Sequence, residues 1–208
     1  MDPRQAEVSR LLDRYLVEIV ERYDLCPWAK SARLNGEVAR EVLWGQPSLE
    51  AWVDAGRRLL AAPKARVAMV IAPEFQGSLT ELRAVRTHVS TAIGDAGVAE
   101  FHPDADLDLA SPSRLVRFLR RSPDPMMQLV PLSILDSVRG GDRIHIDQLD
   151  QVALLRGELV LPVNIGEQIA DQNHASITAA TEAVVAKLAH IAADRAASYA
   201  RVGINTSR

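Results

Sequence analysis

The sequence predicts a single α/β domain over residues 1–208, with a central, mainly parallel sheet of four or five strands flanked by helices and a long C-terminal helix. Three observations favour this fold. Apolar side chains recur at helical spacing near the N-terminus, short apolar runs alternate with capped helical stretches, and an alanine-rich helical pattern fills the end of the chain. Strands joined by helices favour parallel pairing, because parallel neighbours require a crossover connection.

The first three elements follow from periodicity and punctuation. Residues 4–23 form a predicted helix, since its apolar positions recur at steps of three and four and lie on one stripe: Val8, Leu11, Leu12, Tyr15, Leu16, Ile19, Val20 and Tyr23. The turn Asn35-Gly36 precedes a predicted strand over residues 37–43. Ser48 is the predicted N-cap of a helix that reaches about Ala61.

The middle of the chain repeats the pattern of strand and helix. Residues 66–72 are a short apolar run ending at Pro73, which is typical of a buried strand. A helix is predicted from Ser78 to about residue 96, with Gly97 as its stop signal, and residues 98–102 form the next predicted strand. Ser111-Pro112 opens another helix that extends to residue 119, and residues 126–130 form a fourth strand.

The last third is less regular. Gly140-Gly141 separates the fourth strand from a fifth candidate over residues 143–147, and residues 158–162 fit either a strand or a loop packed on the sheet. Residues 140–163 also fit an insertion within the domain. From about residue 165 the apolar positions fit a long closing helix, which ends near residue 200 before Gly203.

Composition and charge exclude some partners. The chain has 208 residues, 48% of them hydrophobic and 25% charged, and a net charge of −3, which gives no field that would attract nucleic acid. The N-terminus lacks the pattern of a secretory signal, and no apolar run reaches the roughly 18 residues of a membrane span. Together with a single cysteine, this predicts a cytoplasmic protein without membrane contact, and it leaves the oligomeric state open.

Several familiar sites are absent from the sequence. It has no phosphate-binding Gly-Lys loop, no dinucleotide-binding glycine pattern and no serine-hydrolase elbow. Residues 104–108 begin like a calcium loop, but Leu109 and Leu115 occupy the positions that require glycine and glutamate. One cysteine and five scattered histidines do not suggest zinc. We therefore predict neither a cofactor nor a metal.

Cys26 is the most informative candidate residue. It follows the first helical pattern and precedes Pro27, which is favoured as the first residue of a helix, so Cys26 is predicted to cap a short helix. Unpaired backbone N–H groups and the helix dipole favour a thiolate there, which predicts a pKa below the roughly 8.5 of a free cysteine. The alternative is that Cys26 is a small buried apolar residue, as free cysteines often are.

Four segments resemble a known family. They are Leu25-Cys26-Pro27-Trp28-Ala29, Phe101-His102-Pro103-Asp104, Arg121-Ser122-Pro123-x-Pro125 and, more faintly, Asn173 near the start of the long helix. Their order and spacing are similar to those of the uncharacterised bacterial family called domain of unknown function 1415. The resemblance covers most of residues 10–135 and part of the final helix.

This chain departs from the family at three positions. The family usually has phenylalanine where this chain has Trp28, asparagine where it has Asp24, and asparagine where it has Arg120. The resemblance implies a common fold and carries no established activity. It nevertheless gives more weight to the polar residues in the matched segments.

Those residues define two hypotheses. His102, Asp104, Arg121 and Ser122 should lie at strand ends, where ligands of open parallel sheets usually bind. In the first hypothesis the chain is a small-molecule enzyme with Cys26 as nucleophile or redox centre and His102 as base. Its substrate is a small anion held by Arg121, whose fork suits a carboxylate or phosphate. The other expected binding residues are Trp28, Lys30, Asp104, Ser122 and Asn173.

In the second hypothesis the same rim binds an anion or a protein partner without catalysis, and Cys26 is buried. Bland alternatives also apply to single residues. Trp28 fits a core or lid residue as well as a stacking platform, His102 fits a backbone-bonded residue at a strand end, and Asn173 fits a helix cap. The sequence alone does not decide whether the chain is an enzyme.

Overall fold

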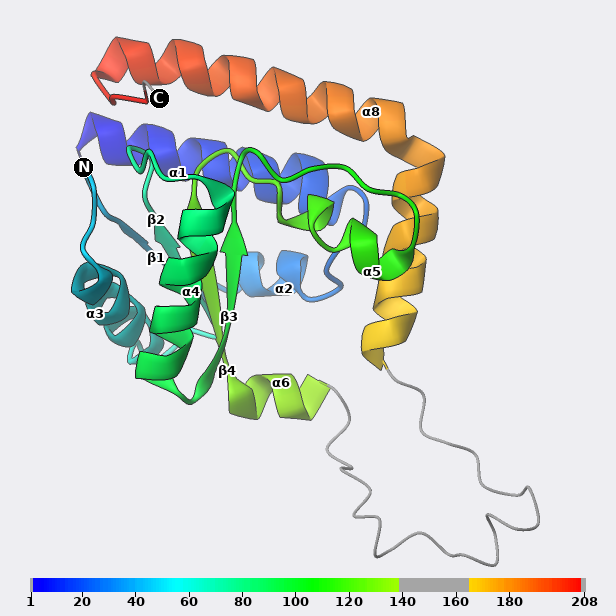
Figure 1. Cartoon of the computed structure of the whole chain (residues 1–208), viewed down its shortest axis with the longest axis horizontal. Helices are drawn as coiled ribbons and strands as arrows, with labels where there is room; N and C mark the ends of the chain where they lie inside the picture. The colour runs from blue at the N-terminus through cyan, green and yellow to red at the C-terminus, as the bar shows by residue number, and fades with distance from the viewer. Residues whose placement is uncertain (1, 139–164, 207–208) are drawn as a thin grey trace, which may run out of the picture.

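A computed structural model describes residues 2–138 and 165–206 and shows a mixed α/β fold around one four-stranded sheet (Figure 1). In chain order the elements are α1 (Pro3–Tyr15), η1 (Leu16–Glu21), α2 (Ala29–Leu34), β1 (Val38–Val42), α3 (Leu49–Leu60), β2 (Val67–Ile71), α4 (Leu79–Ile93), β3 (Ala96–Phe101), α5 (Pro112–Leu115), η2 (Phe118–Arg120), β4 (Met126–Pro131), α6 (Leu132–Val138) and α8 (Ile165–Val202). The fifth candidate strand, at 143–147, and residues 158–162 lie outside the described residues.

The sheet is mixed, so the prediction of a mainly parallel sheet is wrong. Its strand order is β1-β2-β4-β3, and β4 pairs antiparallel with both neighbours while β1 and β2 pair parallel. The connection between β3 and β4 explains the difference. Its helices α5 and η2 have four and three residues, too few to span a strand of roughly 17 Å at about 1.5 Å per residue. β4 therefore begins at the same end of the sheet at which β3 finishes, and it runs antiparallel to β3.

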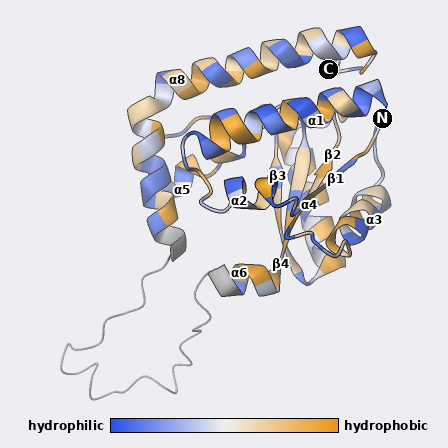
Figure 2. Cartoon of the chain, turned by 180° about the vertical axis from the view of Figure 1, so that it is seen from behind, coloured by the Kyte–Doolittle hydropathy of each residue, from blue (hydrophilic) through white to orange (hydrophobic). Residues whose placement is uncertain are grey.

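Side chains along each strand point alternately to the two faces of the sheet, so the core has one layer on each face. Met69 and Ile71 of β2 pack with α1 and the second half of α8 on one face of the sheet. Ala68 and Val70 pack with α3 and α4 on the other face. Figure 2 shows that α1 and α8 both carry hydrophobic and hydrophilic residues, as expected of helices with one buried side.

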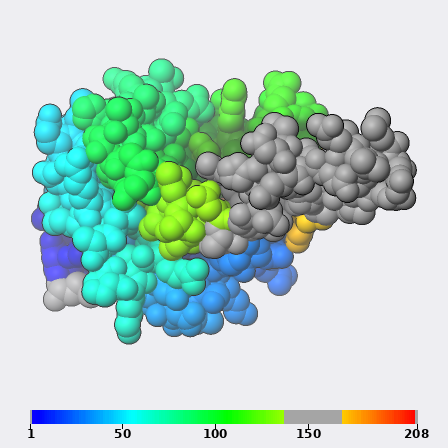
Figure 3. Space-filling view, turned by 90° about the horizontal axis from the view of Figure 1, so that it is seen from below, coloured from blue at the N-terminus to red at the C-terminus, as the bar shows by residue number. Residues whose placement is uncertain are grey.

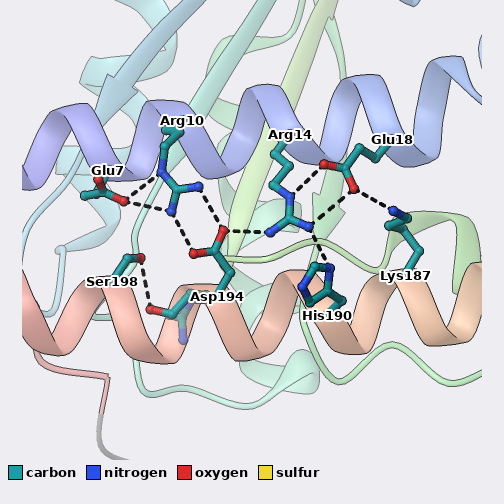
Figure 4. Close-up of polar contacts among 9 residues, drawn as sticks. Glu7, Arg10, Arg14, Glu18, Lys187, His190, Asp194 and Ser198 are labelled. Carbon is teal, nitrogen blue, oxygen red and sulfur yellow. Dashed lines mark hydrogen bonds and ion pairs between the residues drawn. The ribbon is translucent and has the colours of Figure 1, made fainter.

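Charged side chains also fasten α8 to α1. Asp194 accepts two hydrogen bonds from Arg10, at 2.8 and 3.0 Å, and one from Arg14 at 2.7 Å (Figure 4). Arg14 also donates to Glu18 at 2.7 Å, and Lys187 pairs with Glu18 at 3.1 Å. The two helices therefore lie side by side with a shared row of ion pairs above their apolar contact.

The serine caps are where the sequence predicted them, but some helix ends differ from the prediction. Ser48 and Ser78 cap α3 and α4 as expected, and Glu81 completes a capping box with Ser78. However, α4 ends at Gly94, whose φ of 77° lies in the left-handed region, and Gly97 lies within β3. A Cβ atom at Gly97 would come within 2.5 Å of a terminal methyl group of Leu135, so a larger residue there would require the Leu135 side chain of α6 to shift.

Candidate functional site

Cys26 lies between the sheet and the helices of the α1 layer, where it lines two neighbouring cavities. One has a volume of about 230 Å³ and reaches toward Tyr15 and Met126, and the other has about 250 Å³ and reaches toward Ile134 and Leu135 of α6. The two cavities share five of their lining residues: Cys26, Trp28, Ala32, Val67 and Gln128. Seen from below, α6 lies between the surfaces of α4 and α2 (Figure 3). The thiol therefore belongs to a cavity site, and it is half-buried.

The backbone around Cys26 differs in detail from the predicted helix cap. A turn closes first, with the Ala29 N–H donating to the Cys26 carbonyl at 3.1 Å, and α2 begins at Ala29 with Trp28 preceding it. Pro27 is thus not the first residue of the helix. Asp24 precedes the turn with a φ of 51°, a conformation that asparagine and glycine tolerate better than aspartate does.

Electrostatics around the thiol oppose the prediction of a lowered pKa, which is therefore wrong. Burial raises the pKa of the Cys26 thiol above its ordinary value, and the nearby carboxylate of Asp24 raises it further. Hydrogen bonding with the backbone of Trp28 and Ala29 lowers the pKa, but this effect is weaker than burial. The resting group at neutral pH is the uncharged thiol.

Asn173 reaches the same loop from α8. Its side-chain amide is buried at 4% exposure and donates a hydrogen bond to the Leu25 carbonyl at 3.1 Å, and neighbouring Gln172 donates to Asp24 at 3.2 Å. The Asn173 Oδ1 atom is buried without a hydrogen-bond partner among the described residues. Asn173 therefore positions the Cys26 loop, and it lines neither of the two cavities.

His102 does not join Cys26. It follows Phe101, which lines the Cys26 cavity, so alternation directs the buried His102 ring to the opposite face of the sheet. There its Nδ1 atom accepts a hydrogen bond from the Asp104 backbone at 3.1 Å, and its Nε2 atom lies 3.2 Å from the Gly77 carbonyl. This arrangement suits a neutral ring with the proton on Nε2. His102 holds two loops together and does not act as a base for Cys26.

Ser122 and its proline-rich turn have a structural role. The buried Ser122 hydroxyl donates to the Asp124 carbonyl at 2.6 Å. Asp124 is itself buried, and its carboxylate accepts hydrogen bonds from Arg195 at 2.7 Å and from the Tyr199 hydroxyl at 2.6 Å. Burial raises the pKa of Asp124, whereas Arg195 opposes that shift. Sequence reasoning missed this network, although Asp124 is the unspecified position of the Arg-Ser-Pro-x-Pro segment.

The predicted edge of the sheet does contain a cavity. About 290 Å³ lies beyond the carboxyl ends of β2 and β3, lined by Glu74, Pro103, Asp104 and Arg195 among others. Of the predicted site residues, only Asp104 lines it. Arg195 is held at its wall by Asp124 and by the Pro73 carbonyl, to which it donates at 3.0 Å.

The remaining predicted residues are dispersed. Trp28 lines both Cys26 cavities with 43% of its surface exposed, whereas Lys30 is exposed on α2 and lines neither cavity. Arg121 is half-buried and lines neither of them, whereas the preceding residue, Arg120, lines the cavity that reaches toward Tyr15. The structure therefore brings Cys26 and Trp28 together, with Asn173 behind their loop, and it separates them from His102, Arg121 and Ser122.

Other comparisons add limits. Among the described residues there is no cluster of three histidine, cysteine or acidic side chains suited to a metal ion. No helix in residues 2–138 or 165–206 combines the length and apolar character needed to cross a membrane. Compared with models of protein families, with curated proteins and with solved structures, the chain matches none. The resemblance to domain of unknown function 1415 stays a prediction.

Proposed function

We propose that the chain binds a small, mainly apolar molecule in the two cavities beside Cys26, without covalent chemistry at the thiol. The observation that carries this proposal is the pair of adjoining cavities, which share five lining residues. Each approaches the lower end of the roughly 300–1,000 Å³ found for small-molecule sites. The walls are mainly aliphatic or aromatic, so burial of apolar ligand surface supplies the affinity.

Polar groups at the walls favour a ligand with a polar end. Gln128 of β4 lines both cavities, and its side-chain amide makes no hydrogen bond with any described residue. It offers a donor and an acceptor at the point where the cavities adjoin. Glu37 and Arg66 line the second cavity, where Arg66 is exposed to solvent. A ligand with an apolar body and a hydrogen-bonding or charged end matches this distribution.

The thiol-enzyme hypothesis has less support. The pKa of Cys26 is raised, and His102 is directed to the other face of the sheet with both ring nitrogens engaged. A nucleophilic thiol needs a base within hydrogen-bonding reach or a lowered pKa. Neither condition is met by His102 and Arg121, so binding explains the site better than catalysis does.

The test is binding of an apolar probe with one anionic group, 1-anilinonaphthalene-8-sulfonate, followed by its fluorescence. Ala32 lines both cavities, so the larger side chain of Ala32→Phe should occupy part of their space and weaken probe binding roughly tenfold or more. Ala61→Phe, at an exposed position outside both cavities, is the matched control and should bind like the native chain. Equal probe binding by the native chain and Ala32→Phe, at similar melting temperatures, would contradict the proposal.

A further inference from the structure

On the face of the sheet opposite the Cys26 cavities, several arginine side chains surround one buried carboxylate. Glu100 of β3 is buried, and its Oε1 atom lies 3.3 Å from Nε of Arg83 on α4. Its Oε2 atom lies 3.1 Å from Arg120 and 3.6 Å from Nε of Arg86. Burial of one carboxylate needs a compensating cation, but three arginines surround this one.

A fourth arginine lines the same place. Arg117 borders a small cavity of about 30 Å³ together with Arg83, Arg120 and Glu100. We call Arg83, Arg86, Arg117 and Arg120 the arginine cluster. In the part of the chain that the structure describes, Glu100 is the one carboxylate that pairs with these arginines, and Arg117 has no ion pair there. Three positive charges therefore lie within 4 Å of one negative charge, and a fourth borders the same cavity.

The cluster is also short of hydrogen-bond acceptors. The Nε atom of Arg86 is buried and has no hydrogen-bond partner among the described residues, because 3.6 Å from Glu100 is too long for a hydrogen bond. Guanidinium groups that converge on one point repel each other unless an anion separates them. The cavity also borders Leu79, the first residue of α4, where the positive end of the helix dipole adds to the same field.

We propose that the arginine cluster binds a phosphate group. Guanidinium forks match the oxygen atoms of phosphate, and Arg83, Arg117 and Arg120 line one cavity. The cavity itself is smaller than a phosphate, but the side chains of Arg83 and Arg120 are more than a third exposed and can move apart around one. Arg117 supplies a charge that Glu100 does not neutralise. Val116 and Arg120 also line one of the Cys26 cavities, so the two sites adjoin. The phosphate proposal nevertheless rests on Glu100 and its arginines and does not depend on the apolar ligand proposed above.

The test is a calorimetric titration of the full chain, which measures the heat and affinity of binding. The chain is titrated with inorganic phosphate and, separately, with phenyl phosphate, and sodium chloride at the same ionic strength is the reference. Arg117→Ala removes the arginine that has no ion pair, and it should weaken binding about tenfold. Arg114→Ala is the matched control, three residues earlier at the end of α5, because Arg114 is exposed and pairs with Asp108 at 2.7 Å. It should leave the affinity within about twofold of the native value.

Saturable binding of either compound that weakens in Arg117→Ala and persists in Arg114→Ala supports the site. Binding of inorganic phosphate alone identifies a free ion as the ligand, whereas binding of phenyl phosphate identifies a phosphate group on a larger molecule. Two results overturn the proposal. One is heat no greater than that of chloride for both compounds, and the other is equal affinity in the native chain and Arg117→Ala.

Discussion

Replacing Tyr199 with phenylalanine removes one hydroxyl group from a buried ion pair, and its cost can be worked from the structure. The hydroxyl donates to Asp124 at 2.6 Å, and both residues are buried. A hydrogen bond to a charged group contributes roughly 1.5–3 kcal/mol, so we expect Tyr199→Phe to lower the free energy of unfolding by about 2 kcal/mol. In a domain of this size that corresponds to a melting temperature roughly 4–8 °C lower.

Removing the cation should cost more and should depend on pH. Arg195→Met leaves the Asp124 carboxylate buried without its charged partner, which typically costs about 3–5 kcal/mol. Burial raises the pKa of Asp124, and loss of Arg195 raises it further. A carboxyl group with a raised folded pKa favours the folded state once it is protonated. The stability gap between Arg195→Met and the native chain should therefore narrow as the pH falls toward the unfolded pKa of about 3.9.

Urea unfolding followed by circular dichroism measures both variants. Lys187→Met is the control, since it removes a half-exposed ion pair with Glu18 and should cost less than about 1 kcal/mol. The reasoning is refuted if Tyr199→Phe costs no more than Lys187→Met. A gap for Arg195→Met that stays constant from pH 7 to pH 4 would refute the assigned role of Asp124.

Three other predictions concern local chemistry. Alkylation of Cys26 by iodoacetamide should accelerate only as the pH approaches the raised pKa of the thiol, and Asp24→Asn should move this profile to lower pH because it removes a nearby negative charge; an unmoved profile contradicts this. The pKa of Asp194 is lowered to about 2 by Arg10 and Arg14, so its stabilising effect should be complete above about pH 4 and disappear as the pH falls to 2. Asp194→Asn, measured by thermal unfolding, should lack that loss. Gly94→Ala should cost about 1 kcal/mol in urea unfolding because φ is positive there, and a neutral result would show that the turn relaxes.

Local patterns predicted most of the elements because each depends on neighbouring residues. The stripe through Val8 and Leu11 identified the first helix, and the serine caps located α3 and α4. The direction of β4 was not local, since it depends on how the long β3–β4 connection folds back. Gly97 was mistaken for a helix stop because its packing partner, Leu135, lies far along the chain.

The candidate site was predictable only in part. Proximity of Cys26 and Trp28 follows from their spacing, and the resemblance placed Asn173 with them. Strict alternation could have shown that Phe101 and His102 face opposite sides of the sheet. Burial of Cys26 was not visible in sequence, so the thiol pKa was predicted in the wrong direction. Nor could spacing reveal that Arg120 would lie against Glu100.

The break in α8 at Ala180 divides one helix between two attachments. Its φ and ψ of −121° and 17° interrupt the helix, separating a first part that holds the Cys26 loop through Asn173 from a second part that is tied to α1 through Asp194. The second part carries the charged network and the buried Tyr199. The described contacts of the first part with other segments are single hydrogen bonds of Gln172, Asn173 and His174 and the apolar packing of Ile177. Amide hydrogens of residues 165–179 should consequently exchange with solvent faster than those of residues 181–202. The part of α8 that contacts the Cys26 loop therefore unfolds locally at a lower free energy than the part that packs on α1.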